Sequence, residues 1–471
     1  MKRYERYADE IAALIRHGTL SPGDRLPSVR QASASRRISP ATVFEAYYLL
    51  EGRGLIHARP RSGYYVSPAV AATHNGDVPH SQPKQRSAKV AISELVFEVL
   101  GSVKDREVVP LGSAFPSPEL FPLAQLAKHL ARGMRNLDPW RIVEDLPPGN
   151  DQLRRQIGRR YAIAGMSIDT DEIIVTSGAL EALNLSLSAV TRPGDIVVVE
   201  SPTFYAALQA LERLSLKVVE VATSPRHGID LEALAGVLQR HEVKACWLMP
   251  NFQNPLGSRM PDERKRALVA MLAAHRVPLV EDDVYAELYF GAQAPLPAKA
   301  YDRDGMVMHC SSFSKCLAPG YRVGWVAAGR HARTVERLKL MTTLSAAIPS
   351  QEALASYLEH GGYDRHLRKL RLALARQQQV ALDTIAQHFP AGTRVTRPDG
   401  GYFLWLELPQ ALDALELHRL ALLRKISIAP GLLFSADRRF TNCVRINYGY
   451  PDDRKIVAAL KTVGQLAASL L

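Results

Sequence analysis

The residues best suited to chemistry in this chain surround a lysine. Lys315 lies in SSFSKCLAPGYRVGW (residues 311–325), directly after an apolar run typical of a β-strand. A lysine amine can form a Schiff base with an aldehyde, while hydroxyls and a guanidinium, here Ser312, Ser314 and Arg322, can bind phosphate. The segment therefore indicates a site for an aldehyde cofactor that carries phosphate. Taken alone, a Ser-Lys pair would equally suit a surface loop.

Three upstream segments could complete such a site. EDDVYAEL (residues 281–288) follows the apolar run VPLV, so Asp282 is expected at a strand end, where an aspartate can pair with a protonated ring nitrogen. The acids alone could instead bind metal, but no histidine or further carboxylate accompanies them at a recognisable spacing. Asn254 in MPNFQNPLG could donate to a ring hydroxyl. TSGALEALNL (residues 176–185) reads as a strand, a glycine turn and a helix start, whose backbone N–H groups can bind phosphate.

The elements that would position these residues alternate along the chain. Helical segments are predicted at 178–191, 203–214, 230–240 and 261–275, and most strand-like runs are separated by one of them. The predicted strands are Ile173–Thr176, Ile196–Glu200, Lys217–Val221, Ala245–Met249, Pro278–Glu281, Met306–Ser311 and Val323–Ala328. This alternation predicts an α/β domain with a mostly parallel central sheet covered on both faces.

In order and spacing, these segments resemble the fold type I aminotransferases, which depend on pyridoxal 5'-phosphate. The resemblance extends from about Pro110 to Tyr450 and includes RPDGGYFLWLEL (residues 397–408) and CVRINYGY (residues 443–450). It implies an aspartate aminotransferase-like domain with a large subdomain at about 150–340. A smaller C-terminal α+β subdomain is expected at about 341–471.

The resemblance also implies a role for each matching residue. Lys315 would form the Schiff base with the cofactor, and Asp282 would pair with its pyridine nitrogen. Asn254 and Tyr285 would hydrogen-bond the ring oxygen. The residues expected to hold the phosphate, through side chains or backbone, are Gly178, Ala179, Leu180, Ser312, Ser314 and Arg322.

Two further positions follow from the same resemblance. In SPTFYAAL (residues 201–208), Phe204 is expected to stack on the cofactor ring, with its neighbour Tyr205 as the alternative. Arg445 matches the arginine that binds the carboxylate of an amino acid, a role that suits its planar fork of donors. Considered in isolation, a phenylalanine is most often a core residue and an arginine most often a surface or salt-bridge residue.

The first 68 residues form a separate basic segment. They contain eleven Lys or Arg against six Asp or Glu, and so hold +5 of the formal net charge of +12. A first helix is predicted at residues 4–17, a second that Ser28 caps, and a third that Ser39-Pro40 opens. After Gly54, LIHARPRSGYYV reads as a two-stranded hairpin. The positive charge suits a polyanionic partner, and two helices joined by a short turn make a helix-turn-helix. A basic solvated surface on a small helical domain is the plainer interpretation.

PGDRLPSVR, SPATVFEAYYLLEGRGLI and ARPRSGYYV together resemble the winged helix-turn-helix of the GntR family of bacterial regulators, over about residues 4–67. Helix N-termini and guanidinium groups bind DNA phosphates, and helix side chains reach base edges in the major groove. The residues that the resemblance places against double-stranded DNA are Arg30, Ser39, Ala41, Thr42, Arg59, Arg61, Ser62 and Gly63. Arg36-Arg37, Pro40 and Phe44 depart from the usual pattern, which puts the operator sequence in doubt.

Polar residues broken by Pro and Gly join the two halves, so the sequence predicts a DNA-binding domain at 1–68, a linker at 69–100 and an aminotransferase-like domain at 101–471. This arrangement resembles the MocR-type subfamily of GntR regulators. The resemblance implies a homodimer, with the winged helix of one chain packed against the aminotransferase domain of the other. No apolar run of about 18 residues occurs and the start lacks a signal-peptide pattern, so a cytoplasmic location is expected.

Three functions remain compatible with the sequence. The favoured one is a pyridoxal phosphate-dependent transcription regulator that senses an amino acid or amine. A working aminotransferase with a DNA-binding appendage is the alternative, because Lys315, Asp282 and Arg445 are all present and the freed lysine could move the α proton. In the third, the cofactor is structural only and the protein does not respond to amino acids.

Overall fold

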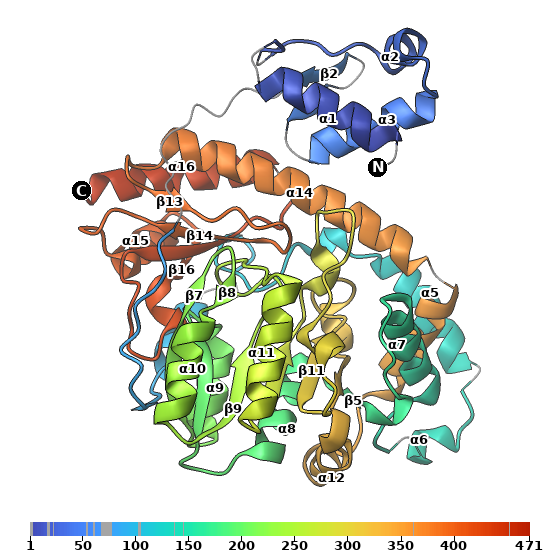
Figure 1. Ribbon diagram of the computed structural model, residues 1–471, viewed down its shortest axis with the longest axis vertical. Coiled ribbons are helices and arrows are strands. Elements are labelled where there is room, and N and C mark those ends of the chain that lie inside the picture. Colours follow the sequence, from blue (N-terminus) through green and yellow to red (C-terminus); the bar gives the residue numbers. More distant parts are fainter. Residues whose placement is uncertain are drawn as a thin grey trace.

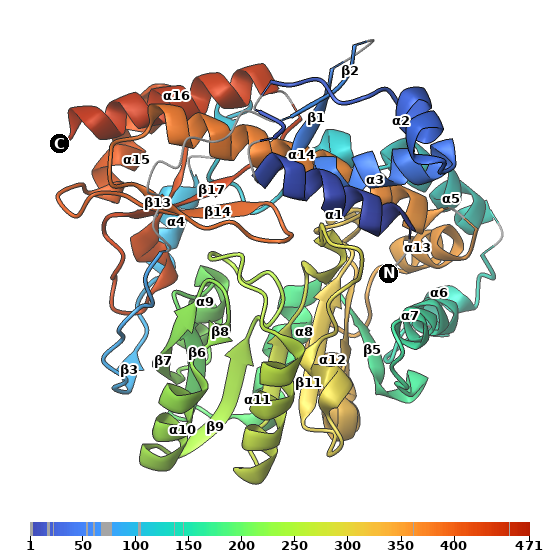
Figure 2. The ribbon, with the colours of Figure 1, turned by 45° about the horizontal axis from the view of Figure 1, so that its top comes forward.

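The computed structural model describes residues 3–16, 19–21, 23–52, 55–59, 62–66, 78–101, 105–135, 137–144, 146–360, 362–451 and 453–471. A small N-terminal domain is followed by a much larger α/β domain (Figure 1). In both views the small domain lies over the long helix α14 (Tyr363–His388) of the large one (Figure 2). Within the described part of the chain, no helix is both long enough and apolar enough to span a bilayer.

The N-terminal domain consists of three helices and a two-stranded antiparallel sheet. Its elements are α1 (Arg3–Arg16), α2 (Val29–Arg36), α3 (Pro40–Gly52), β1 (Ile56–Arg59) and β2 (Gly63–Val66). The apolar face predicted for the first helix is present, because Tyr7 and Ile11 are buried in a core that α3 completes with Val43, Tyr47 and Leu50. The predicted helices and hairpin are therefore confirmed.

Short-range signals fix the ends of these helices. The Ser28 hydroxyl accepts from the backbone N–H of Gln31, and the Gln31 side chain accepts from the backbone N–H of Ser28, which is a capping box at the start of α2. Arg37 ends α2 with a left-handed backbone, φ 52°. The Ser39 hydroxyl accepts from the Thr42 N–H at 3.1 Å, and Pro40 occupies the first position of α3.

Residues 78–101 differ from the linker predicted for 69–100. They form β3 (Ala88–Lys89), which extends the edge of the large sheet beside β7 (Lys217–Ser224), and α4 (Ser93–Gly101). The Glu212 side chain accepts from the backbone N–H groups of Ile92 and Ser93 at 3.0 and 2.9 Å. The polar composition of this segment reflects an edge position, where backbone groups pair with the sheet although few side chains are buried. Residues 69–77 of the predicted linker lie outside the described residues.

The large domain is built on a sheet in the strand order β3-β7-β6-β9-β10-β11-β12-β5, with β8 (Gly228–Ile229) paired to β7. Strands β7, β6, β9, β10 and β11 run parallel to one another, whereas β12 runs antiparallel to both of its neighbours, β11 and β5. The remaining strands are β5 (Ile173–Thr176), β6 (Ile196–Ser201), β9 (Val243–Leu248), β10 (Leu279–Asp282), β11 (Val307–Ser312) and β12 (Gly324–Ala327). The predicted mostly parallel sheet is confirmed.

Alternate residues of a strand point to opposite faces, so the apolar run of β6 serves two cores. Val197 and Val199 pack on one face with α8 (Ala179–Val190) and α9 (Tyr205–Arg213). Val198 packs on the other face, in the core that includes residues of α10 and α11. The helices α10 (Leu231–Arg240), α11 (Asp262–Ala274) and α12 (Ala332–Thr342) follow in the chain.

The C-terminal part carries a four-stranded antiparallel sheet in the order β13-β14-β17-β16. Two segments between β3 and β5 in the chain pack with this part: β4 (Val109–Pro110) pairs with β15 (Ile426–Ser427), and α5 (Leu123–Arg135) packs on α13 (Ile348–His360). The other elements are α6 (Arg141–Glu144), α7 (Asp151–Ile163), β13 (Arg394–Val395), β14 (Phe403–Glu407), α15 (Ala414–Leu423), β16 (Ala429–Pro430), β17 (Cys443–Asn447) and α16 (Asp453–Ser469).

Candidate functional site: a cofactor site and a DNA-binding surface

Lys315 follows the central strand β11, in the turn that begins after Ser312. Its Nζ donates to the backbone oxygen of Ala114 at 2.8 Å and lies 3.7 Å from the centre of the Phe115 ring. Burial and the nearby Arg445 guanidinium lower the pKa of this amine to about 7, although Asp282 acts in the opposite direction. The amine is therefore neutral in part at neutral pH, which a lysine nucleophile requires.

Asp282 is the last residue of β10, and its side chain is only 1% exposed. Burial and the neighbouring Asp283 raise the pKa of its carboxyl to about 7, whereas Lys315 lowers it. Among the described residues, nothing donates a hydrogen bond to its Oδ1. A buried carboxylate oxygen without a donor is costly, so this atom is suited to a cationic N–H from a bound molecule, such as a pyridinium.

Asn254 and Tyr285 come from the ends of two neighbouring strands and meet at the same place. The Asn254 amide nitrogen lies 3.4 Å from the Tyr285 hydroxyl, and both side chains are buried. Burial raises the pKa of Tyr285, so its hydroxyl keeps its proton and can donate. The two side chains therefore lie close enough to donate to one ligand oxygen, and their role at the cofactor ring stays a prediction.

The start of α8 forms an open cradle beside Arg322. Gly178 precedes the helix with φ 87°, and no side chain caps the helix, so the first N–H groups, at Ala179 and Leu180, are available. A Cβ at Gly178 would overlap the Arg322 guanidinium, which explains why glycine occupies this close approach. Helix N–H groups together with an arginine suit a phosphate.

The predicted phosphate serines join this cradle. Arg322 donates through Nη1 to the Ser314 hydroxyl at 3.5 Å and through Nη2 to the Ser177 backbone oxygen at 3.2 Å. The Ser312 hydroxyl accepts from the Ser314 N–H at 3.3 Å. Both serine side chains are buried, and both hydroxyls lie next to the turn that carries Lys315. The structure therefore brings the phosphate residues and the lysine into one site.

Arg445 is fully buried on β17. Its Nη1 donates to the Asn254 side-chain oxygen at 3.1 Å, and its Nη2 donates to the backbone oxygens of Gly112 and Ser113 at 2.7 and 3.2 Å. Its Nε is buried and has no acceptor among the described residues. A buried guanidinium with a spare donor, linked through Asn254 to the cofactor site, is suited to bind a carboxylate.

The two aromatic candidates for ring stacking lie side by side. Phe204 precedes the first turn of α9 and is partly buried, and its ring centre is 4.7 Å from that of Tyr205. Tyr205 is more deeply buried, and the Arg445 guanidinium partly offsets the rise in its pKa that burial causes. The less buried Phe204 remains the predicted stacking residue.

Sequence reasoning missed one side of the site, the segment Gly112–Phe115. Its backbone oxygens accept from Lys315, Arg445 and Asn447, and its Phe115 ring covers the lysine amine. Tyr402 also donates to the Ala114 oxygen at 3.1 Å. Backbone contacts carry no side-chain signature, and the only signal available was a run of small residues before Phe115-Pro116.

Most of the predicted DNA-facing residues that the structure describes are exposed. Arg30, Ser39 and Ala41 lie at the starts of α2 and α3 and are exposed, while Thr42 is partly buried. In the wing, Gly63 is exposed and the Ser62 hydroxyl lies 2.6 Å from the Tyr65 hydroxyl. Arg61 and the side chain of Arg59 lie outside the described residues.

Sequence reasoning also missed Arg25. A Cβ at Gly63 would lie 3.6 Å from the Arg25 Nε, and the Arg25 backbone pairs with Tyr65, so this arginine is held against the wing. Nothing in the local sequence brings it there, because it lies 38 positions before Gly63.

Comparisons with known proteins find a matching family for each of the two domains. Residues 3–66 match the family of bacterial regulatory proteins of the gntR family, and residues 145–462 match the class I and II aminotransferases. The chain is 51% identical over 466 residues to the HTH-type transcriptional regulator YdcR of Escherichia coli (strain K12), with 99% of each chain covered. It is 38% identical over 465 residues to the regulator YjiR of the same strain, with 99% of this chain and 98% of that one covered.

One solved structure connects the fold to its cofactor. The α-aminoadipate aminotransferase LysN from Thermus thermophilus, complexed with N-(5'-phosphopyridoxyl)-L-leucine, is similar with a TM-score of 0.72 and 28% sequence identity. The similarity covers 81% of this chain and 99% of that one.

Proposed function

Because this chain belongs to the GntR-family regulators that carry a class I and II aminotransferase domain, we propose that it regulates transcription and binds pyridoxal 5'-phosphate on Lys315. The observation that carries the proposal is the unpaired, buried Oδ1 of Asp282 beside a lysine whose pKa is lowered to about 7. A polar group left unpaired in the interior is expected to have a ligand as its partner.

The residues present fit the cofactor at each of its polar ends. Pyridoxal phosphate supplies an aldehyde for the lysine amine, an electron-poor ring and a phosphate. Asp282 would hold the ring nitrogen, and Asn254 and Tyr285 the ring oxygen. The start of α8 with Arg322, Ser312 and Ser314 would hold the phosphate.

Arg445 would bind the carboxylate of an amino-acid effector. It now donates to the backbone oxygens of Gly112 and Ser113, which a carboxylate with two acceptors could replace. Such a ligand would release the segment that also accepts from Lys315, so effector binding and the position of this segment are coupled. An amine without a carboxylate would leave these contacts in place.

The winged helix would place α3 in the major groove of double-stranded DNA, with Ser39, Ala41 and Thr42 at the base edges and Arg30 on phosphate. The wing residues would contact the adjacent backbone. We further propose a homodimer that acts in the cytoplasm. Within one chain, α3 of the winged helix packs on α14 of its own aminotransferase domain, so the exchange of winged helices between chains that the resemblance implies is not part of this proposal. Two winged helices would then read two half-sites of an operator.

One observation also favours catalysis. A Lys315 Nζ with a pKa near 7 can take up and release a proton at neutral pH, which proton transfer in transamination requires. A regulator needs only the binding, so the two functions differ in whether an amino acid is converted.

The assignment of the lysine is tested with Lys315→Ala. The purified protein is expected to show the long-wavelength absorbance of lysine-bound pyridoxal phosphate, and the variant to lose it. Persistence of the same band in Lys315→Ala would contradict the assignment.

The assignment of the function is tested by footprinting on the DNA upstream of the protein's own gene, with and without cofactor and a panel of amino acids and amines. Protection that changes with these ligands supports regulation. Absent protection under every condition, together with measurable transamination, would favour the enzyme.

A further inference from the structure

A cavity of about 600 Å³ lies next to the cofactor site. It is bounded by α7, residues 283–297, the strands β11 and β12, and α14. Ser312 lines it and is shared with the cofactor site, whereas Lys315, Asp282 and Arg445 do not line it. Its volume falls within the range of about 300 to 1,000 Å³ that is usual for small-molecule sites.

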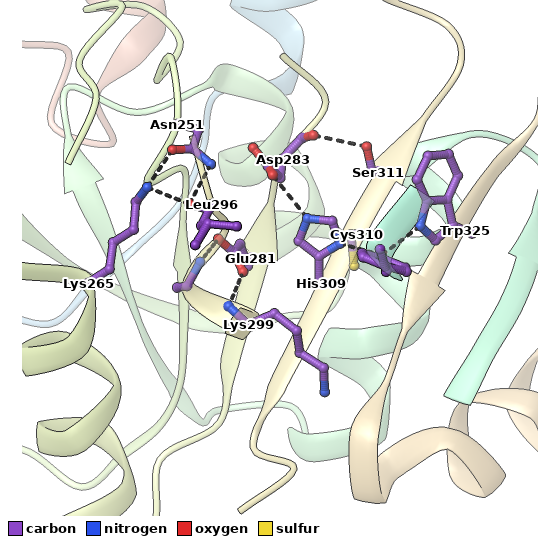
Figure 3. Close-up of polar contacts among 12 residues, drawn as sticks. Asn251, Lys265, Glu281, Asp283, Leu296, Lys299, His309, Cys310, Ser311 and Trp325 are labelled. Atoms are coloured by element: carbon purple, nitrogen blue, oxygen red, sulfur yellow. Dashed lines mark hydrogen bonds and ion pairs between the residues drawn. The ribbon is translucent and has the colours of Figure 1, made fainter. Parts of the chain in front are cut away.

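The floor of the cavity is a buried polar network (Figure 3). Asp283 follows Asp282, and its Oδ2 lies 3.0 Å from the His309 Nε2. The other ring nitrogen of His309 lies 2.7 Å from the Tyr161 hydroxyl, to which the Trp325 indole donates at 2.8 Å. These contacts hold the Tyr161 and Trp325 side chains in fixed positions, so the cavity is preformed.

The walls of the cavity are aromatic. Arg371 lies 3.7 Å from the centre of the Tyr289 ring, and Arg160 lies 4.5 Å from the centre of the Tyr363 ring. The aromatic residues that line the cavity within the large domain are Tyr161, Tyr289, Phe290, Phe313, Trp325 and Tyr363. Such walls favour a flat, apolar ring as the body of the ligand.

Of the arginines that line the cavity, two are paired and one is not. Glu287 lies 2.6 Å from Arg160 and 3.1 Å from Arg371, and Asp364 lies 3.2 Å from Arg160. Arg368 lines the cavity from α14 and is exposed, and no ion pair joins it to any described residue. A single unpaired guanidinium at an aromatic cavity favours a ligand with one carboxylate.

The cavity also reaches the DNA-binding domain. Tyr48 of α3 and Arg368 of α14 both line it. Burial raises the pKa of the Tyr48 hydroxyl and the nearby Arg368 guanidinium partly offsets this rise, so the two side chains are close. The same helix begins at Pro40 with the residues expected to read DNA. A molecule in the cavity would therefore contact the helix that carries the recognition residues.

We propose that this cavity binds a small aromatic carboxylate, with its ring between the aromatic walls and its carboxylate on Arg368. Because Tyr48 completes the cavity only when the winged helix is docked on α14, the ligand binds the docked arrangement more tightly. It thus biases the position of α3, as differential affinity for two arrangements requires. The cavity shares Ser312 with the cofactor site, but the ligand contacts none of Lys315, Asp282 and Arg445.

The test measures binding to the full-length protein by calorimetry with three probes of similar size: phenylacetate, its neutral analogue 2-phenylacetamide, and benzyltrimethylammonium, a cation that cannot bond an aldehyde. Phenylacetate is expected to bind about ten-fold more tightly than the amide, because a carboxylate gains charged hydrogen bonds. Preference for the cation, or no binding of any probe, would overturn the proposal.

Matched variants locate the probe. Arg368→Gln is expected to lower the affinity for phenylacetate about ten-fold. Arg365→Gln should leave this affinity unchanged, because Arg365 is exposed on α14 and does not line the cavity. Arg445→Lys should also have no effect. If Arg445→Lys weakens the probe and Arg368→Gln does not, the acid occupies the cofactor site and the proposal fails.

Trp325 provides a second readout, because its indole lies in the cavity floor. Phenylacetate should change the tryptophan fluorescence of the parent protein, and Trp325→Phe should lose this change while calorimetry still detects binding. A fluorescence change that survives in Trp325→Phe would place the probe elsewhere.

The link to α3 is tested with Tyr48→Ala. This variant is expected to bind phenylacetate about three-fold more weakly, which corresponds to the loss of one aromatic contact. Phe44→Ala is the control, because Phe44 is 54% exposed on the same helix and does not line the cavity. Equal affinities in the two variants would show that the winged helix does not contribute to the site.

Discussion

The proposed DNA-binding surface and the proposed cofactor site differ in how their polar side chains are satisfied. At the start of α3, Ser39 and Ala41 lie at the surface, and the Ser39 hydroxyl accepts from the Thr42 N–H of its own helix without DNA. Around Lys315 the polar groups are buried, and Asp282 Oδ1 and Arg445 Nε lack partners among the described residues. An exposed surface therefore tolerates the absence of its ligand, whereas a buried site is incomplete without one.

This difference predicts unequal effects of mutation. Loss of a polar contact in the interior leaves another group unpaired, while loss of one at the surface is compensated by solvent. The expected effects decrease from the buried site to the surface.

The largest effect is expected for Asp282→Asn. The amide is a poor partner for a protonated ring nitrogen, so the affinity for pyridoxal phosphate should fall about 100-fold, as when one member of a buried charge pair is removed. Absorbance titration measures the affinity. Asp283→Asn is the control, since Asp283 pairs with His309 and faces the aromatic cavity. Equal losses in both variants would indicate general damage to the sheet.

The second prediction concerns pH. Only the neutral amine of Lys315 bonds an aldehyde, and its pKa is lowered to about 7. The rate of cofactor attachment should therefore fall about ten-fold per pH unit below 7 and level off above it. A rate that keeps rising towards pH 10 would show an ordinary lysine.

The pH profile of Asp282→Asn provides a further test of the Lys315 pKa. Asp282 raises the pKa of Lys315, so its removal should move the midpoint of the profile to lower pH. A midpoint that moves upward, or does not move, would contradict the placement of the two groups beside each other.

In the winged helix, Arg30→Gln should weaken binding to duplex DNA about five-fold. The slope of log affinity against log salt concentration should also become shallower by about one unit, because one fewer phosphate is neutralised. Fluorescence anisotropy at several salt concentrations measures both. Arg6→Gln serves as the control, because Arg6 lies on α1 and pairs with Glu10 at 3.6 Å. An unchanged salt dependence in Arg30→Gln would show that Arg30 does not contact a DNA phosphate.

The smallest effect is expected for Ser28→Ala, which removes the cap of α2. The free energy of unfolding of the winged helix should fall by about 1 kcal/mol, with cofactor affinity unchanged. Ser28→Asp should restore it, because aspartate also caps helices. Hydrogen exchange of the α2 amides measures the change, and a loss of cofactor affinity would show that the two domains are coupled more tightly than expected.

Much of the architecture was predictable from the sequence, because the relevant signals are local. Ser28 and Ser39-Pro40 mark helix starts within four residues, and the run Ile196–Val199 is apolar because both of its faces are buried. Residues 78–101 were predicted less well, since β3 depends on pairing with β7, more than 100 residues away.

The candidate site likewise contains residues that local sequence signals predict and residues that only the folded structure reveals. Lys315, Asp282, Asn254, Arg322 and Arg445 could be identified because each is a side chain of a definite type at a definite place in a motif. The Gly112–Phe115 segment could not, because it acts through backbone oxygens that every residue has. Arg25 was missed because only the folded wing brings it to Gly63.

The sequence by itself thus determined the types of the reactive groups, the order of the strands and helices along the chain, and the family. Only the tertiary structure decided which groups are buried and unpaired, and therefore which pKa values shift, because burial depends on segments far apart in the chain. It also decided that an aromatic cavity lies between the sheet and α3, since Tyr48, Tyr161, Trp325 and Arg368 share no sequence pattern and meet only in the folded protein.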